Sequence, residues 1–220
     1  MRVNYFGHAA VASWQTAGDA LAGVTLGAML PDFSVMCGAR IAAGGSADVD
    51  AGIALHHATD AVFHTAPAVS ALFRDAEKRM EARGVRRGPM RAAAHVGVEL
   101  VLDGVLLDDA RHRDAYTAAM AHDTAALVWK EDGDAERFAM LLARLRHHGV
   151  PEDLRRPRAA AERIFRMLAG RRLLAPEASE RGAIADVLEE IAPRIAVAAP
   201  TIIRQVEAGL AQRASTDPGH

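Results

Sequence analysis

Histidine and carboxylate side chains recur at intervals of four residues in the stretch GIALHHATDAVFH, residues 52–64. His56, Asp60 and His64 stand at positions i, i+4 and i+8, and His57 forms a tighter row with the last two. On an α-helix these positions share one face, so imidazole and carboxylate groups at this spacing can bind one divalent cation. The neighbouring residues are apolar, and a charge on a buried face is unfavourable without a partner. This stretch therefore predicts a metal site on a helix.

A second stretch, AAAHVGVELVLDG, repeats the pattern with His95, Glu99 and Asp103. Two further polar residues stand among apolar neighbours near the N-terminus, His8 in YFGHAAVA and Asp32 in GAMLPDF. A lone polar residue near a core usually finds a hydrogen-bonding partner in the protein, whereas a coincident cluster of them is typical of a metal site. We expect these groups to converge on one buried cavity. The predicted metal ligands are His8, Asp32, His56, Asp60 and His95.

The donor types indicate which cofactor such a site would take. Imidazole with several carboxylates and no thiolate favours Mn, Mg, Fe or a catalytic Zn over a structural Zn site. Nucleophilic catalysis has little support, because Cys37 lies in a glycine-rich segment without a neighbouring base and no serine has a G-x-S-x-G context. The sequence therefore points to a divalent metal ion.

Arginines cluster just before the second stretch and offer positive charge for a phosphate group. The cluster consists of Arg83, Arg86, Arg87 and Arg91. Arg91 is one turn ahead of His95 and is expected on the same helix face. A second basic segment, residues 155–172, would suit docking of an acidic surface, although charge runs of this kind are usually a solvated face.

Composition favours an all-α protein. Half of the 220 residues are hydrophobic and only 5% are aromatic, while the helix-favouring residues alanine and leucine are abundant. Helical periodicity predicts helices at about 4–13, 16–30, 48–66, 67–83, 90–107, 110–129, 134–148, 157–169 and 177–213. Pro31 is expected to end the second helix, and Pro193 and Pro200 to kink or divide the last. With no strand pattern and no long linker, we expect a single-domain helical bundle over residues 1–213 and a frayed tail at 214–220.

Charge and cysteine content limit the partners and the location. There are 26 basic and 28 acidic residues, so no global field favours nucleic acid or an anionic membrane. A single cysteine excludes an internal disulfide, the N-terminus lacks the apolar region of a cleavable signal, and no apolar stretch reaches the roughly 20 residues of a membrane span. We expect a cytoplasmic protein that binds neither nucleic acid nor membrane. The histidines expected at the surface are His112, His122, His147, His148 and His220.

Three short motifs follow one another over residues 3–64. The first has the form N-[FY]-x-x-H and is matched by Asn4, Tyr5 and His8. The second, G-x-x-L-x-D-F, is matched by Gly27, Leu30, Asp32 and Phe33. The third, G-I-x-x-H-x-x-x-D, is matched by Gly52, Ile53, His56 and Asp60. In order and spacing these motifs resemble the acyl carrier protein phosphodiesterase family, which is related to helical HD-type metal phosphohydrolases.

Where many members of this family have a D-x-x-x-D-H-F-L segment, this chain has HVGVELVL, with His95 and Glu99 at the carboxylate positions and no following histidine. The resemblance implies an HD-domain-like fold and hydrolysis of the phosphodiester that links 4'-phosphopantetheine to a serine of holo acyl carrier protein, with manganese or a similar divalent metal. Acyl carrier proteins are acidic, so a basic rim would steer them. The catalytic residues would then be Asp60, Glu99 and Arg91, and the substrate-binding residues His57, His64, Arg87 and Asp103.

Two other classes of protein remain open. One is a non-catalytic, ligand-sensing helical regulator, but the first 50 residues, where a basic recognition module would be expected, contain only Arg2 and Arg40 as basic side chains. The other is a metal-binding helical bundle with another activity, such as a redox-active di-metal protein. That class expects Glu-x-x-His pairs, whereas HVGVE places its partners four apart and in the reverse order.

Overall fold

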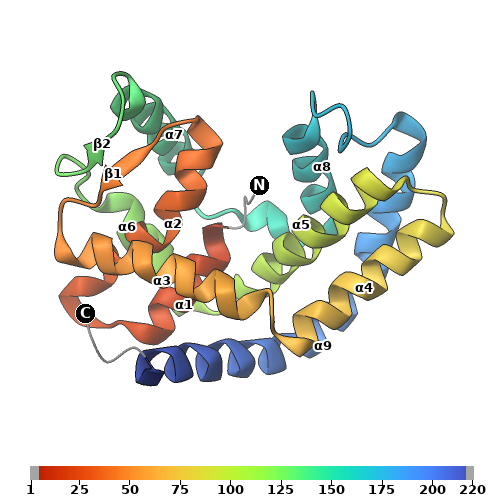
Figure 1. Ribbon diagram of the computed structural model, residues 1–220, viewed down its shortest axis with the longest axis horizontal. Helices are drawn as coiled ribbons and strands as arrows, with labels where there is room; N and C mark the ends of the chain where they lie inside the picture. Colours follow the sequence, from red (N-terminus) through yellow and green to blue (C-terminus); the bar gives the residue numbers. More distant parts are fainter. Residues whose placement is uncertain (1–4, 217–220) are drawn as a thin grey trace. The chain divides into compact units, whose positions relative to one another are not determined.

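The structure, a computed structural model, describes residues 5–216 and the side chains of residues 5–215. The described chain is all-α, which confirms the predicted class (Figure 1). Its helices are α1 (Tyr5–Gln15), α2 (Leu21–Cys37), α3 (Ala47–Phe63), α4 (Pro67–Ala82), α5 (Arg87–Leu106), α6 (Ala110–Ala121), α7 (Asp134–His148), α8 (Pro157–Leu168) and α9 (Ala178–Thr216), with short 3₁₀ turns at Gly18–Ala20 and Glu152–Arg155. The predicted tail is helical to Thr216. Asn4 and His220 lie outside the described residues.

The chain forms two compact units, each made of two separate stretches. The first comprises the residues up to Asp60 and Leu106–Pro151, and the second comprises Ala61–Val105 and the residues from Glu152 onward. Each unit has its own buried apolar side chains. The prediction of one domain over residues 1–213 stays a prediction.

The first unit is built around α2, against which α1, α6 and α7 pack. Residues 23–30 of this helix are buried without exception. Aromatic rings from α1, α2 and α6 pack together beside it, with centroids 5.2 to 6.1 Å apart. This packing fixes α1 against α2, and both helices carry predicted metal ligands.

Helix α2 continues through Pro31, which was expected to end it. Proline removes one backbone hydrogen bond, but the apolar residues on both sides of it are buried and hold the helix in place. The segment Gly18–Cys37 is long and apolar enough to cross a membrane by length and composition, and 56% of its most apolar 18-residue window is buried inside the protein. The cytoplasmic location stays a prediction.

Two short strands, β1 (Ile41–Ala43) and β2 (Val128–Trp129), pair antiparallel in the first unit. The sequence did not predict them, and the helix expected to reach residue 129 ends at Ala121. The Asp123 carboxylate accepts a hydrogen bond from the Ala125 backbone N–H, a local turn that competes with the helix. Strands of two and three residues are too short to show an alternating pattern.

His112, expected at the surface, is buried in the first unit. Its Nδ1 lies 2.8 Å from the Leu106 carbonyl oxygen, and the Trp14 indole N–H donates to its Nε2 at 2.9 Å. A carbonyl only accepts and an indole only donates, so the ring is neutral with its proton on Nδ1. Burial lowers the pKa of His112 below its usual value, which matches this neutral state.

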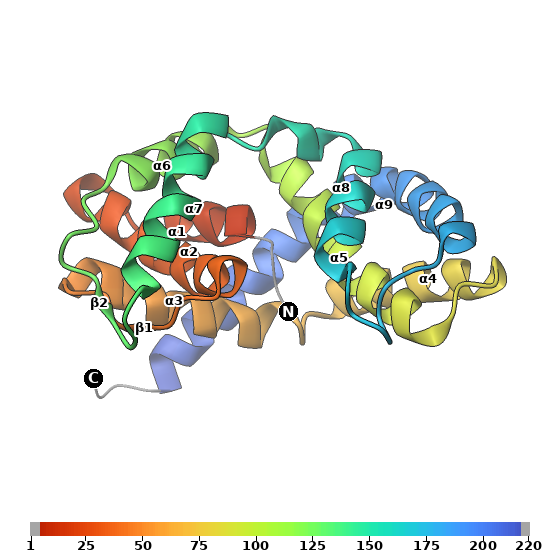
Figure 2. The same ribbon diagram turned by 90° about the horizontal axis from the view of Figure 1, so that it is seen from above.

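In the second unit, α9 packs against both α4 and α8 (Figure 2). It runs unbroken from Ala178 to Thr216, so the prediction that Pro193 or Pro200 divides it is wrong. Both prolines are exposed, and so are Glu189 and Ala196, whose carbonyls lose their helical partners. Water can solvate those carbonyls while the opposite, apolar face of α9 stays packed.

Candidate metal centre

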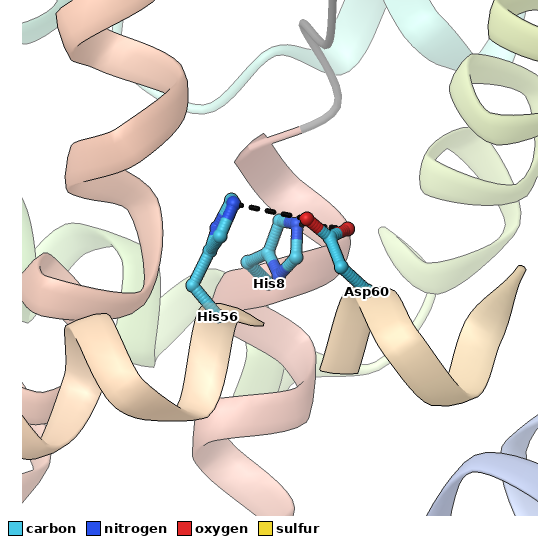
Figure 3. A group of neighbouring side chains, drawn as sticks. All are labelled: His8, His56 and Asp60. Carbon is cyan, nitrogen blue, oxygen red and sulfur yellow. Dashed lines mark ion pairs between the residues drawn. The ribbon is translucent and has the colours of Figure 1, made fainter. Parts of the chain in front are cut away.

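The first unit brings together three of the predicted ligands, His8 from α1 and His56 and Asp60 from α3 (Figure 3). His56 Nε2 lies 3.2 Å from Asp60 Oδ2, and His8 Nε2 lies 3.6 Å from Asp60 Oδ1. All three side chains are buried. Metal bonds of about 2.0–2.2 Å to imidazole nitrogen and carboxylate oxygen place adjacent ligand atoms roughly 3–3.5 Å apart. The observed spacing is close to that of a coordination sphere.

Two glycines set the position of α3 against α2. A Cβ on Gly27 would lie 2.1 Å from the Val49 carbonyl oxygen, and one on Gly52 would lie 2.2 Å from the Val24 carbonyl oxygen. The two helices therefore cross with their backbones in direct contact, which only glycine permits. His56 follows Gly52 by one turn, so the crossing carries its ring to the backbone of α2.

The ring of His56 has a defined tautomer. Its Nδ1 lies 2.8 Å from the Ala28 carbonyl oxygen, which can only accept, so Nδ1 carries the proton. In the neutral ring Nε2 then presents its lone pair toward the Asp60 carboxylate. Two electron-rich atoms at 3.2 Å repel one another unless a proton or a cation lies between them. Metal-binding histidines characteristically donate their other ring N–H to a carbonyl in this way.

His8 and Asp32 complete the group. The His8 ring stacks on the His56 ring with centroids 4.0 Å apart, and its Nε2 lies 3.8 Å from Asp32 Oδ2. The group thus gathers two imidazole rings and two carboxylates within a few ångströms, and these are donor types that bind a divalent cation.

The remaining predicted ligand, His95, lies in the second unit, where it forms a group of its own with His64 and Glu99. Asp103, predicted to bind substrate, is buried one turn beyond Glu99. His57 is exposed beside His56.

The sequence predicted that His56, Asp60 and His64 lie along one face of a single helix. The contact between His56 and Asp60 confirms the first pair. The second pair, Asp60 and His64, is wrong. Helix α3 ends at Phe63, and His64 lies in the turn that leads to α4 at Pro67. Backbone hydrogen bonds from Thr65 and Ala66 to Val62 and Phe63 close this turn.

The arginines before the second stretch divide into two kinds. Arg86 is held by Glu180, which accepts its side-chain N–H groups at 2.9 and 3.0 Å and its backbone N–H at 2.7 Å. This contact lowers the pKa of Glu180 to about 2. Arg83 pairs with Glu190. Both arginines are thus engaged in structural ion pairs, which argues against their predicted role in holding a phosphate.

Arg87 and Arg91 are exposed and line a surface depression of about 540 Å³ between α4 and α5. Arg74 and Lys78 add positive charge to its wall, and two glutamates of α4 add negative charge. In the second basic segment, three arginines are paired with acidic side chains: Arg155 with Glu152, Arg158 with Asp186 and Glu189, and Arg163 with Asp153. The predicted basic surface is neutralised at those positions.

No family model, curated protein or solved structure matches this chain. The candidate centre therefore rests on the geometry of its own residues. Sequence reasoning missed the Ala28 carbonyl, which orients His56, and Phe73, which packs on the second group. The signal that could have located the first was the pair Gly27 and Gly52, because glycines within two apolar helices indicate a close crossing.

Proposed function

We propose that this protein is a metal-dependent phosphoester hydrolase with an HD-like helical arrangement around its metal. His8, His56 and Asp60 would hold the ion, with Asp32 beside them. The observation that carries the proposal is the 2.8 Å contact of His56 Nδ1 with the Ala28 carbonyl oxygen, which turns Nε2 toward the Asp60 carboxylate in a buried site.

A bound divalent cation would lower the pKa of a water molecule toward neutrality and stabilise negative charge on phosphoryl oxygens. Asp60 contacts both imidazoles, so it serves best as a ligand. Asp32 Oδ2 lies 3.8 Å from His8 Nε2, at the edge of the group, and would be the carboxylate that accepts a proton from water. The rings of His8 and His56 stack on one another and are buried, which would limit the access of bulk water to a bound ion.

The proposed substrate is the phosphodiester of holo acyl carrier protein, from which 4'-phosphopantetheine would be released. The support is the resemblance of the three N-terminal motifs, which include His8, Asp32, His56 and Asp60. An acidic carrier protein would find positive charge at the depression lined by Arg87 and Arg91.

The test is incubation of the purified protein with Mn²⁺ and holo acyl carrier protein, followed by intact mass measurement of the carrier. Conversion to the apo carrier is expected, and His56→Ala and Asp60→Asn should abolish it while far-UV circular dichroism stays that of the parent. His147→Ala, an exposed histidine of α7, is the matched control and should keep parental activity. A carrier mass unchanged with Mn²⁺, Mg²⁺, Fe²⁺ and Zn²⁺ would reject this substrate. Metal binding without hydrolysis of any phosphoester would favour a non-catalytic role.

A further inference from the structure

A second group of metal-ligating side chains lies within the second unit. His95 and Glu99 are one turn apart on α5, and His64 lies in the turn before α4. Glu99 Oε1 is 3.1 Å from His95 Nε2 and 3.8 Å from His64 Nε2. One ligand atom from each residue lies within 4.8 Å of the others. A single carboxylate oxygen therefore faces two imidazole nitrogens.

Glu99 is the residue that most needs a partner. Its side chain is 1% exposed, and its neighbours on α5, Val98 and Leu100, are buried as well. In the described part of the chain, neither of its oxygens accepts a hydrogen bond. His95 Nε2 lies 3.1 Å from Glu99 Oε1, which is short enough for a hydrogen bond, but the angle between the two groups does not allow one. A buried carboxylate in this state is unfavourable unless a positive ion balances it.

The aromatic ring of Phe73, on α4, holds the two histidines in place. It stacks on His95 with a centroid distance of 4.6 Å and on His64 at 6.3 Å. Packing therefore orients both rings before any ion binds. The His95 side chain is 41% exposed, so the group opens to solvent on that side and leaves room for a water molecule or another ligand.

We propose that His64, His95 and Glu99 bind a divalent transition-metal ion at a site separate from the one in the first unit. Two imidazoles and one carboxylate suit Zn²⁺, Fe²⁺ or Co²⁺, whereas Mg²⁺ and Ca²⁺ prefer oxygen ligands. Three protein ligands with an open side are the arrangement of catalytic rather than structural zinc. This site goes beyond the proposed hydrolase, because its occupancy does not depend on hydrolysis or on any substrate.

The experiment measures how many metal ions each protein molecule binds. Metal-free full-length protein is titrated with Co²⁺ while visible absorption is followed, and the bound metal is then measured by mass spectrometry after gel filtration. The parent should hold two equivalents. Glu99→Gln and His95→Ala should each lose one equivalent, and His56→Ala should lose the other. His147→Ala, the exposed matched control, should hold both.

Three results would overturn the proposal. The first is a parent whose bound metal is unchanged by His95→Ala and Glu99→Gln. The second is a Glu99→Gln variant that keeps both equivalents with parental absorption. The third is a single equivalent that either His56→Ala or His95→Ala removes, which would show one shared centre. His95→Gln, at a partly exposed ring, replaces Glu99→Gln if the latter fails to fold. The measured quantity is metal content. A protein that binds both ions but does not hydrolyse the carrier protein would therefore reject the proposed function and not this site. A protein that hydrolyses the carrier protein but lacks the second equivalent would reject this site and not the proposed function.

Discussion

Substitution of Gly52 by alanine tests whether the backbone contact between α2 and α3 positions the metal ligands. The new Cβ would lie 2.2 Å from the Val24 carbonyl oxygen and 2.7 Å from the Gly27 Cα, and real Cβ contacts are essentially never under 3.0 Å. The helices must therefore separate by about 0.8 Å, the difference between 2.2 and 3.0 Å. If the helices separate along the line from His56 Nδ1 to the Ala28 carbonyl oxygen, the distance between these two atoms grows from 2.8 Å to about 3.6 Å. At that distance the two atoms no longer form a hydrogen bond.

Overpacking of this kind costs about 1–3 kcal/mol, and the better helix propensity of alanine offsets about 1 kcal/mol of it. We expect Gly52→Ala to lower the free energy of unfolding of the metal-free protein by up to about 2 kcal/mol in urea titrations. Its affinity for Zn²⁺ at the first site should fall about tenfold or more, measured by calorimetry, because a displaced His56 no longer faces Asp60.

Gly182 provides the matched control, because it lies in α9 and, among the described residues, a Cβ there would meet nothing within 4 Å beyond its chain neighbours and the backbone of its own helix. Gly182→Ala should leave metal affinity unchanged and raise the free energy of unfolding by up to about 1 kcal/mol. A Gly52→Ala protein with parental stability and parental Zn²⁺ affinity would refute the helix crossing as the device that positions His56.

Three further predictions concern pH and metal. The pKa of Glu180 is lowered to about 2 by Arg86, so its contribution to stability is complete above pH 4.5 and lost as pH falls toward 2. Urea unfolding should show Glu180→Gln less stable by about 1–3 kcal/mol at neutral pH, with the gap narrowing below pH 4.5 and closing at about pH 2. Burial lowers the pKa of His112 from 6.5, so the parent should lose stability as pH falls below that value, and His112→Gln should show a flatter profile in the same titration. Zn²⁺ at a hundred times its dissociation constant should raise the free energy of unfolding by about 2.7 kcal/mol per site, and removal of the metal by EDTA should reverse the accompanying rise in Tm. Parental pH profiles in either variant, or a Tm insensitive to metal, would contradict the corresponding prediction.

Most helices of this protein are predictable from periodicity, because each buries one apolar face. The errors at Pro31, Pro193 and Pro200 share a cause. A proline removes one hydrogen bond wherever it stands, but whether the helix ends there depends on the packing of the residues around it and on whether water reaches the freed carbonyl. Burial around Pro31 and exposure at Pro193 and Pro200 are tertiary facts, which local sequence does not contain.

His112 shows the same limit for a polar residue. Its neighbours in the sequence are charged, and the sequence therefore predicted a surface position. The residues that bury it and neutralise it include Trp14, ninety-eight positions earlier in the chain. A histidine in a polar segment can thus be a core residue when one face of its helix is apolar.

The two candidate metal groups show what spacing alone determines. In each, two ligands one turn apart on one helix are visible in the sequence, His56 with Asp60 and His95 with Glu99, and both pairs are in contact. The third ligand is not encoded by spacing. His64 follows Asp60 by four residues, as a ligand of the same row would, but α3 ends one residue too early, and the turn places His64 beside Glu99. The end of one helix thus decides to which of the two candidate groups a histidine belongs. The sequence therefore indicates two members of each candidate group, while helix ends and the helix contacts within each unit determine which further side chains join them.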